Sequence, residues 1–159
     1  MQEYKSIDRK FGVVLGDANL DKMSKLCLRA NNNETGGILV GEYKTSLDCA
    51  IITDILGPTS DSRSGHTWFE RGTKGLQGFL NRYWYSHKRY YVGEWHYHPF
   101  AAPEPSGRDL AQMREISASP SYKCPEPIMI IIGGNPKQEM QIRVFVFPNG
   151  IMDELELVS

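Results

Sequence analysis

The chain has 159 residues, of which 40% are hydrophobic and 23% are charged, and its formal net charge is −1. This length and composition predict one globular domain over residues 1–159 and exclude a disordered or collagen-like chain. Because the near-neutral charge provides no basic field for binding nucleic acid, we expect no nucleic-acid partner.

The N-terminal segment begins with polar residues, and no later stretch approaches the roughly 18 consecutive apolar residues of a membrane span. We therefore expect a cytoplasmic protein without membrane contact. The three cysteines, Cys27, Cys49 and Cys124, are far apart and odd in number. This spacing argues against a disulfide framework or a structural zinc knuckle and predicts reduced, mostly buried thiols.

The first predicted element is an amphipathic helix that begins near Asn19 and ends before the three asparagines at 31–33. Its apolar residues recur at three- and four-residue spacing, which places them on one helix face. Two runs rich in isoleucine and valine, 36–43 and 47–56, then predict strands. The residues that join these two runs predict a hairpin.

Residues 57–72 are rich in glycine, serine and aspartate, which predicts a loop with Trp68 and Phe69 as its aromatic anchor. The later elements alternate between helical and strand patterns. They are a helix over 76–84, a strand over 90–98, a helix over 107–116 and strands over 127–134 and 141–147. This alternation predicts an α/β sandwich around a mixed sheet.

The stretch "HYHPFAAPEPSGRD", residues 96–109, carries the residues that point to chemistry. His96 and His98 are two apart on a predicted strand, so both imidazoles point to the same face with their Cα atoms about 6.6 Å apart. Together with the carboxylate of Asp109 they form a common zinc donor set, which in a catalytic site leaves a fourth position to water. The three prolines between the histidines and Asp109 stiffen the connection.

Ser106 is predicted to cap the helix that carries Asp109. Its hydroxyl and the positive helix end can stabilise negative charge that develops beside the metal. A metal-bound water also needs a base, and Glu34 and Glu94 are the candidates. Strand alternation places Glu94 on the face of the histidines, whereas Glu34 precedes a flexible "TGG" that opens a strand. Spacing alone leaves both carboxylates open.

These residues form a pattern that resembles a known family. The spacing H-x-H-x7-S-x-x-D over 96–109 is similar to that of the JAMM metalloproteases, the active members of the JAB/MPN superfamily. "NETGGILVGEY" resembles the upstream glutamate segment of that family, and "GEWHYHP" and "HTWFERG" look like its bacterial stand-alone members. The likeness extends from the helix before Glu34 to the final strand.

The resemblance implies a JAB/MPN-like (cytidine-deaminase-like) sandwich, with a mixed curved β-sheet flanked by helices. It implies one Zn²⁺ per chain held by His96, His98 and Asp109. It also prefers Glu34 over Glu94 as general base and acid, with Ser106 polarising the scissile carbonyl. Such enzymes hydrolyse a bond after the C terminus of a ubiquitin-like protein by direct attack of water.

The resemblance further implies that residues 61–71 form a flap over the extended tail of the substrate. Trp68, Phe69 and Arg71 are therefore candidate substrate-binding residues, although the two aromatic residues also suit a purely structural role. Tyr97 stands where the family usually has serine or threonine. Alternation directs Tyr97 away from the metal face, so this departure concerns packing rather than the ligands.

The expected function is that of a JAB deconjugase of a ubiquitin-like conjugation operon of the CBASS-type antiphage kind. Its substrate would be a ubiquitin-like protein or a similarly conjugated CD-NTase, and E1- and E2-like conjugation enzymes would be its functional partners. Two alternatives remain open: a catalytically inactive MPN-type interaction scaffold, and a processing protease for a sulfur-carrier ubiquitin-like protein.

Overall fold

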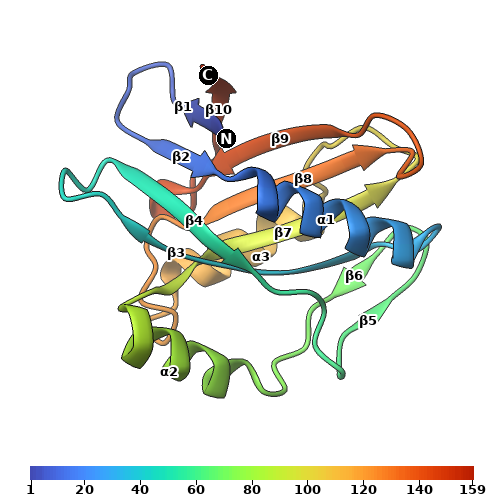
Figure 1. The fold of residues 1–159 in the computed structure, drawn as a ribbon, viewed down its shortest axis with the longest axis horizontal. Coiled ribbons are helices and arrows are strands. Elements are labelled where there is room, and N and C mark those ends of the chain that lie inside the picture. Colours follow the sequence, from blue (N-terminus) through green and yellow to red (C-terminus); the bar gives the residue numbers. More distant parts are fainter.

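The computed structural model describes residues 1–159 and arranges most of the strands in a closed barrel. Figure 1 shows three helices against this barrel and a small two-stranded hairpin beside it. The elements in chain order are β1 (Gln2–Lys5), β2 (Gly12–Leu15), α1 (Asp17–Ala30), β3 (Thr35–Tyr43), β4 (Cys49–Ile55), β5 (Arg63–Ser64), β6 (Phe69–Glu70), α2 (Leu76–His87), β7 (Tyr90–Pro99), α3 (Gly107–Ala118), β8 (Ile128–Gly134), β9 (Gln141–Val146), a short 3-10 turn (Pro148–Gly150) and β10 (Asp153–Leu157).

The expected curved sheet is corrected in one respect by the structure, because the sheet closes on itself into a barrel. The strand order is β1-β10-β9-β8-β7-β3-β4-β2, and β1 pairs with both β2 and β10. Sequence patterning did not predict β1, β2 or β10, which are only four or five residues long. The mixed character of the sheet is confirmed, since β2–β4 and β7–β8 are parallel and the other barrel pairs are antiparallel.

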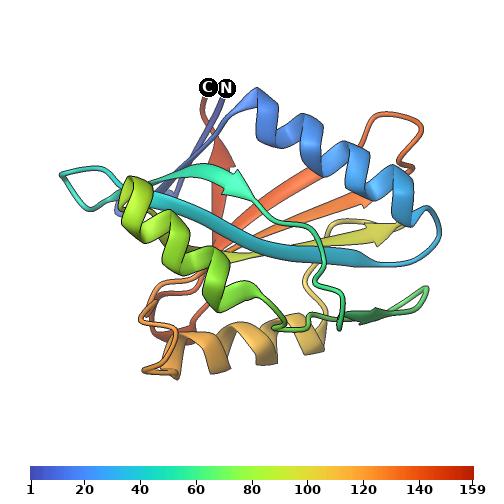
Figure 2. The same cartoon turned by 60° about the horizontal axis from the view of Figure 1, so that its bottom comes forward.

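Two apolar clusters lie on the two faces of the strands. Alternation along β8 divides its isoleucines: Ile130 packs in the cluster that includes Met23 of α1, and Ile131 packs in the cluster that includes Met113 of α3. Because an apolar cluster covers each face of β8, nearly all residues of this strand are apolar and do not alternate with polar ones. Figure 2 shows α1 and α3 on opposite sides of the strands, so the predicted helical flanking of the sheet is confirmed.

The predicted helices and long strands are confirmed, with boundaries that differ by a few residues. Within the expected loop 57–72, β5 and β6 form a short antiparallel hairpin near the start of α3 (Figure 2). All three cysteines are buried and unpaired, as predicted. Among the helices, none combines the length and the apolar character that a bilayer crossing requires.

Candidate metal and catalytic site

Three elements meet at the end of β7 and supply the candidate site. His96 and His98 lie on β7, Asp109 lies in the first turn of α3, and Glu34 immediately precedes β3. In the antiparallel pairing of β3 with β7, Thr35 lies opposite Tyr97. Glu34 is one residue beyond that pair and therefore comes alongside His98, although the two residues are far apart in sequence.

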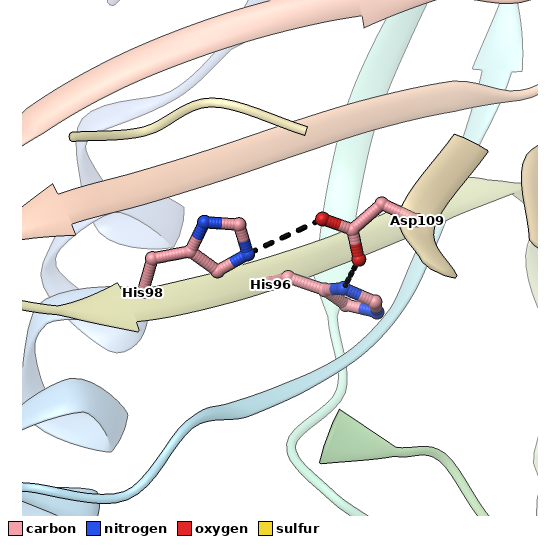
Figure 3. Close-up of side chains that lie close together, drawn as sticks. All are labelled: His96, His98 and Asp109. Atoms are coloured by element: carbon pink, nitrogen blue, oxygen red, sulfur yellow. Dashed lines mark hydrogen bonds and ion pairs between the residues drawn. The ribbon is translucent and has the colours of Figure 1, made fainter. Parts of the chain in front are cut away.

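Both imidazoles contact one carboxylate, as Figure 3 shows. The Nδ1 atom of His96 lies 2.8 Å from Oδ1 of Asp109, and the Nε2 atom of His98 lies 3.3 Å from Oδ2. The Oε1 atom of Glu34 is 3.7 Å from Nε2 of His98, at the edge of this cluster. The expected grouping of these four side chains is therefore what the fold produces.

Ser106 and Asp109 form the start of α3 together. Ser106 is the N-cap residue; its Oγ accepts a hydrogen bond from the backbone N–H of Asp109 at 3.1 Å, and its backbone N–H donates to Oδ2 of Asp109 at 2.8 Å. This reciprocal arrangement is a capping box. Ser106 itself is exposed, whereas Asp109 is buried, so the cap directs the carboxylate inward and leaves the hydroxyl at the surface of the site.

The connection between the histidines and α3 is held against the end of β8. Phe100 N–H donates to the carbonyl of Gly134, and Gly134 N–H donates to the carbonyl of Ala101, both at 2.9 Å. A side chain on Gly133 would place its Cβ 2.4 Å from the Ala101 carbonyl oxygen, so only glycine permits this approach. The connection between the histidines and α3 is therefore restrained twice, by its own prolines and by its hydrogen bonds to the end of β8.

The electrostatics of the cluster favour an ionised Asp109. Burial would raise the pKa of Asp109, but hydrogen bonds with His96 and His98 hold it well below its ordinary range. Burial raises the pKa of Glu34 above its ordinary value, partly opposed by the neighbouring His98. For His98 burial would lower the pKa, but its contact with Asp109 raises it. A cation bound between these groups would compete with the proton that the raised pKa of His98 favours.

The residues present fit a divalent metal. One potential donor atom from each of His96, His98 and Asp109 lies within 4.8 Å of the other two. The Nε2 atom of His96 is buried and has no hydrogen-bond partner, which is unusual for a buried polar atom and is explained if the imidazole serves a ligand. Two nitrogens and one carboxylate oxygen match the donor set of a catalytic zinc site.

The β5–β6 hairpin lies directly beside the cluster. The Phe69 ring meets the His96 ring edge-on, with ring centroids 5.3 Å apart. The carbonyl of Gly65 in the hairpin turn accepts a hydrogen bond from the backbone N–H of Glu34 at 2.9 Å. Trp68 is half-buried, and the guanidinium carbon of Arg108 lies over its ring, 5.9 Å from the ring centroid. The two aromatic residues of the predicted flap therefore border the site.

The side chains of Arg71 and Glu94 are both buried. The Arg71 side chain is 4% exposed and the Glu94 side chain 0% exposed, and Nε of Arg71 donates to Oε1 of Glu94 at 2.5 Å. Tyr91 donates its hydroxyl hydrogen to Oε2 of the same glutamate at 2.6 Å. Glu94 does share the face of the histidines, as alternation predicts, but its two oxygens are occupied. The burial of Arg71 argues against the direct substrate contact expected for it.

Tyr91 and Tyr122 belong to this buried network and were not singled out by sequence patterning. Tyr122 accepts a hydrogen bond from Nη2 of Arg71 at 2.7 Å, and its ring lies 5.0 Å from that of Tyr91. For Tyr91 the only sequence signal was a tyrosine-rich stretch over residues 83–91, which suits an ordinary core equally well, and Tyr122 lies outside that stretch. Tyr97 points into the barrel core and donates its hydroxyl hydrogen to the carbonyl of Asn31, so its predicted orientation away from the metal face is confirmed.

Comparison with known proteins gives related sequences over most of the chain. The sequence profile described as "Prokaryotic homologs of the JAB domain" matches residues 17–146. A protein named CD-NTase/cGAS isopeptidase, from Enterobacter hormaechei subsp. hoffmannii, is 41% identical over 140 residues, which are 88% of this chain and 77% of that protein. A protein named as a probable metalloprotease, from Sinorhizobium fredii, is 31% identical over 121 residues, covering 74% of this chain and 73% of the relative.

A solved structure shows the same fold at low sequence identity. The solution structure of a protein from Desulfitobacterium hafniense aligns with a TM-score of 0.64 and 15% identity, over 92% of this chain and 90% of that one.

Proposed function

Because this chain belongs to the family of prokaryotic homologs of the JAB domain, we propose that it is a zinc-dependent isopeptidase that releases a protein joined to its target through its C terminus. The observation that carries the proposal is the buried cluster of His96, His98 and Asp109 with Glu34 at its edge. The names of two relatives, an isopeptidase and a probable metalloprotease, support a metal-dependent peptidase.

The proposed metal ligands are His96, His98 and Asp109. A bound zinc ion would supply a Lewis acid that polarises a carbonyl oxygen and lowers the pKa of a coordinated water. Glu34 lies beside the donor set rather than within it, 3.7 Å from His98, which suits a proton carrier. Its carboxylate takes a proton from the attacking water and then donates a proton to the leaving amine nitrogen. Burial raises the pKa of Glu34. A carboxylate with a raised pKa binds a proton more readily, which suits a group that must first accept a proton and then donate it.

Ser106 has a hydrogen to donate. Its oxygen already accepts from the Asp109 N–H, and its own O–H makes no hydrogen bond within the protein. We assign that hydroxyl to the oxygen of the scissile carbonyl, which gains negative charge as water adds to the carbon. The hydroxyl is held in place by the same bond that caps α3, so it needs no reorganisation during the reaction.

Trp68 and Phe69 are the proposed contacts for the extended tail of the substrate. Both lie on the hairpin that borders the cluster, and Phe69 touches His96. The half-exposed rings offer flat apolar surfaces to a flexible chain with small side chains. Arg71 is not among these contacts, because its guanidinium is buried.

The substrate class that we propose is a CD-NTase conjugated through its C terminus, by analogy with the Enterobacter hormaechei relative named as a CD-NTase/cGAS isopeptidase. In such a system E1- and E2-like enzymes would make the bond and this protein would reverse it in the cytoplasm during antiphage defence. The 41% identity over 88% of the chain supports this class over an unrelated ubiquitin-like substrate.

The test uses purified protein loaded with one equivalent of zinc and three fusions to green fluorescent protein. The fusions carry at their N-terminal side the CD-NTase of Enterobacter hormaechei, ubiquitin or a bacterial sulfur-carrier protein. We expect cleavage of the CD-NTase fusion immediately after the last CD-NTase residue, identified by mass spectrometry, and no cleavage by Glu34→Gln. Cleavage of the sulfur-carrier fusion alone would reassign the substrate. Zinc binding without cleavage of any fusion would favour an interaction scaffold.

A further inference from the structure

A buried ion pair joins the β5–β6 hairpin to the strand that carries the histidines. Arg71 directly follows β6, and Glu94 lies on β7 two residues before His96. The pair is almost completely removed from solvent, with side-chain exposures of 4% and 0%, and its N–O distance is 2.5 Å. It lies outside the proposed donor set, and the proposed chemistry does not use it.

The guanidinium of Arg71 is held in three directions. Its Nε donates to Glu94 on β7, its Nη2 donates to the Tyr122 hydroxyl at 2.7 Å, and its Nη1 donates to the carbonyl of Gly72 at 2.9 Å. Tyr91 completes the shell by donating to the second oxygen of Glu94. Burial raises the pKa of Tyr91, which keeps its hydroxyl protonated for this bond. Three separate segments of the chain therefore meet at one planar group.

Stability is a poor explanation for such a pair. Removing two charges from water costs about as much as their attraction returns, and apolar residues of similar volume often replace a buried ion pair without loss of stability. What the pair provides is direction, because a guanidinium donates its hydrogen bonds only in the plane of its rigid fork. Because Arg71 directly follows β6, holding its guanidinium in place also holds the backbone at the end of that strand.

Outside this buried pair, the hairpin reaches the rest of the chain through the Gly65 carbonyl, which accepts from Glu34 N–H, and through an exposed contact between Nδ1 of His66 and the Asn32 carbonyl oxygen at 2.9 Å. Its base is closed by the Ser62 hydroxyl, which accepts from Gly72 N–H, and by Asp61, which accepts from the backbone of Thr73 and Lys74. These bonds join the hairpin to itself, and Asp61 is exposed. They hold its shape but do not set its distance from the barrel.

Two contacts of the hairpin with the site depend on that distance. Phe69, two residues before Arg71, meets the His96 ring edge-on, and the Gly65 carbonyl accepts from Glu34 N–H. Gly36 on β3 leaves room for this approach, since a Cβ there would lie 2.9 Å from Cδ2 of His96 and 3.2 Å from Cε2 of Phe69. We propose that the Arg71–Glu94 pair is a positioning device, which holds the 63–70 hairpin against the site so that Phe69 and Gly65 keep His96 and Glu34 in their working positions.

The test separates positioning from stability with the double variant Arg71→Met/Glu94→Met, which removes both charges and preserves apolar packing. Its matched control is Arg63→Met on the exposed strand β5. Hydrogen exchange of the backbone amides of residues 63–70 reports the hairpin without requiring activity. We expect exchange about tenfold faster in the double variant and unchanged in the control, with similar melting temperature and zinc content.

The variant Arg71→Lys tests whether a positive charge alone is enough to hold the hairpin in place. Lysine keeps the positive charge near Glu94 but cannot reach Tyr122 and Gly72 at the same time, so we expect its hairpin to exchange as fast as in the double variant. Full rescue by lysine would reduce the pair to a charge contact and overturn the proposal. This variant also decides the matter if the double variant fails to fold.

The catalytic consequence rests on the proposed function. With the CD-NTase fusion as substrate, we expect kcat/KM about tenfold lower in both variants at unchanged zinc content. Wild-type exchange rates in both variants would overturn the positioning role, and faster exchange with unchanged kcat/KM would overturn its effect on catalysis. If the wild type cleaves no fusion, the proposed function fails, while the exchange rates still decide whether the pair holds the hairpin.

Discussion

Ser106 and Asp109 hold each other in place: each accepts a hydrogen bond from the backbone N–H of the other, at 3.1 and 2.8 Å respectively. The same Asp109 carboxylate faces both imidazoles of the proposed donor set. The same two hydrogen bonds therefore start α3 and orient the aspartate toward the proposed metal site. The three-residue spacing that a capping box requires is also the spacing of the serine and aspartate in the sequence motif.

Two substitutions of Ser106 separate its structural role from its chemical one. Alanine at an N-cap typically lowers the unfolding free energy by about 1 kcal/mol, whereas glycine costs only a few tenths of that. Both remove the hydroxyl, so we expect Ser106→Ala and Ser106→Gly to lower kcat by a similar factor of about 100. Thermal unfolding and steady-state kinetics on the same preparations check this. A glycine variant with near wild-type kcat would contradict the role of the hydroxyl.

Two substitutions of Asp109 should separate its proposed role in metal binding from its role at the start of α3. Asp109→Asn keeps an oxygen for the Ser106 N–H but loses the charge, and Asp109→Ala loses both. We expect both to retain little zinc after dialysis, and only the alanine variant to show the further loss of about 1 kcal/mol that follows when the Ser106 N–H loses its acceptor. Elemental analysis and denaturant unfolding of the metal-free proteins measure the two effects. Stoichiometric zinc in Asp109→Asn would remove the aspartate from the donor set.

Replacement of Glu34 should leave the metal site intact. Glutamine matches the size of Glu34 but cannot accept a proton, so we expect Glu34→Gln to bind one zinc per chain and to lose about 100- to 10,000-fold in kcat. The measurement pairs elemental analysis with cleavage of the CD-NTase fusion. Glu42→Gln, a change at the far end of β3, is the matched control. Loss of zinc in Glu34→Gln would make the glutamate a ligand instead of a base.

Removing the metal should make the stability of the protein depend on the protonation of His98. The pKa of His98 is raised in the folded state by its contact with Asp109, against the opposing effect of burial. Because the folded pKa exceeds the unfolded value of about 6.5, this contact stabilises the metal-free protein fully below that pH, and the stability is lost as the pH rises through the folded pKa. We therefore expect chelator-treated protein to melt at a lower temperature at pH 8 than at pH 6.

The part of this pH effect that belongs to His98 is found by substitution. His98→Gln should reduce the difference in melting temperature between the two pH values, whereas His87→Gln, at an exposed position of α2, should leave it as in the wild type. Zinc should abolish the difference, since the metal binds the neutral imidazole and replaces its proton. An equal pH effect in His98→Gln and wild type would assign it to other groups.

Local patterns in the sequence predicted the two halves of the proposed donor set. Alternation on a strand puts His96 and His98 on one face, and helix capping puts Ser106 and Asp109 in one turn. Both relations act over a few residues, so they hold wherever the strand and the helix form. The same reasoning placed the long strands β3, β7 and β8, whose apolar runs are strong.

Relations between distant segments needed the tertiary structure. The short β1, β2 and β10 carry weak patterns, and their pairing closes the barrel only because the two ends of the chain meet. Which glutamate approaches the histidines also depended on register: β3 brings Glu34 beside His98, while Arg71, 23 residues earlier in the chain, occupies Glu94. Residue types and local geometry determine what chemistry is possible, whereas burial and long-range pairing decide which of the available side chains remain free to perform it.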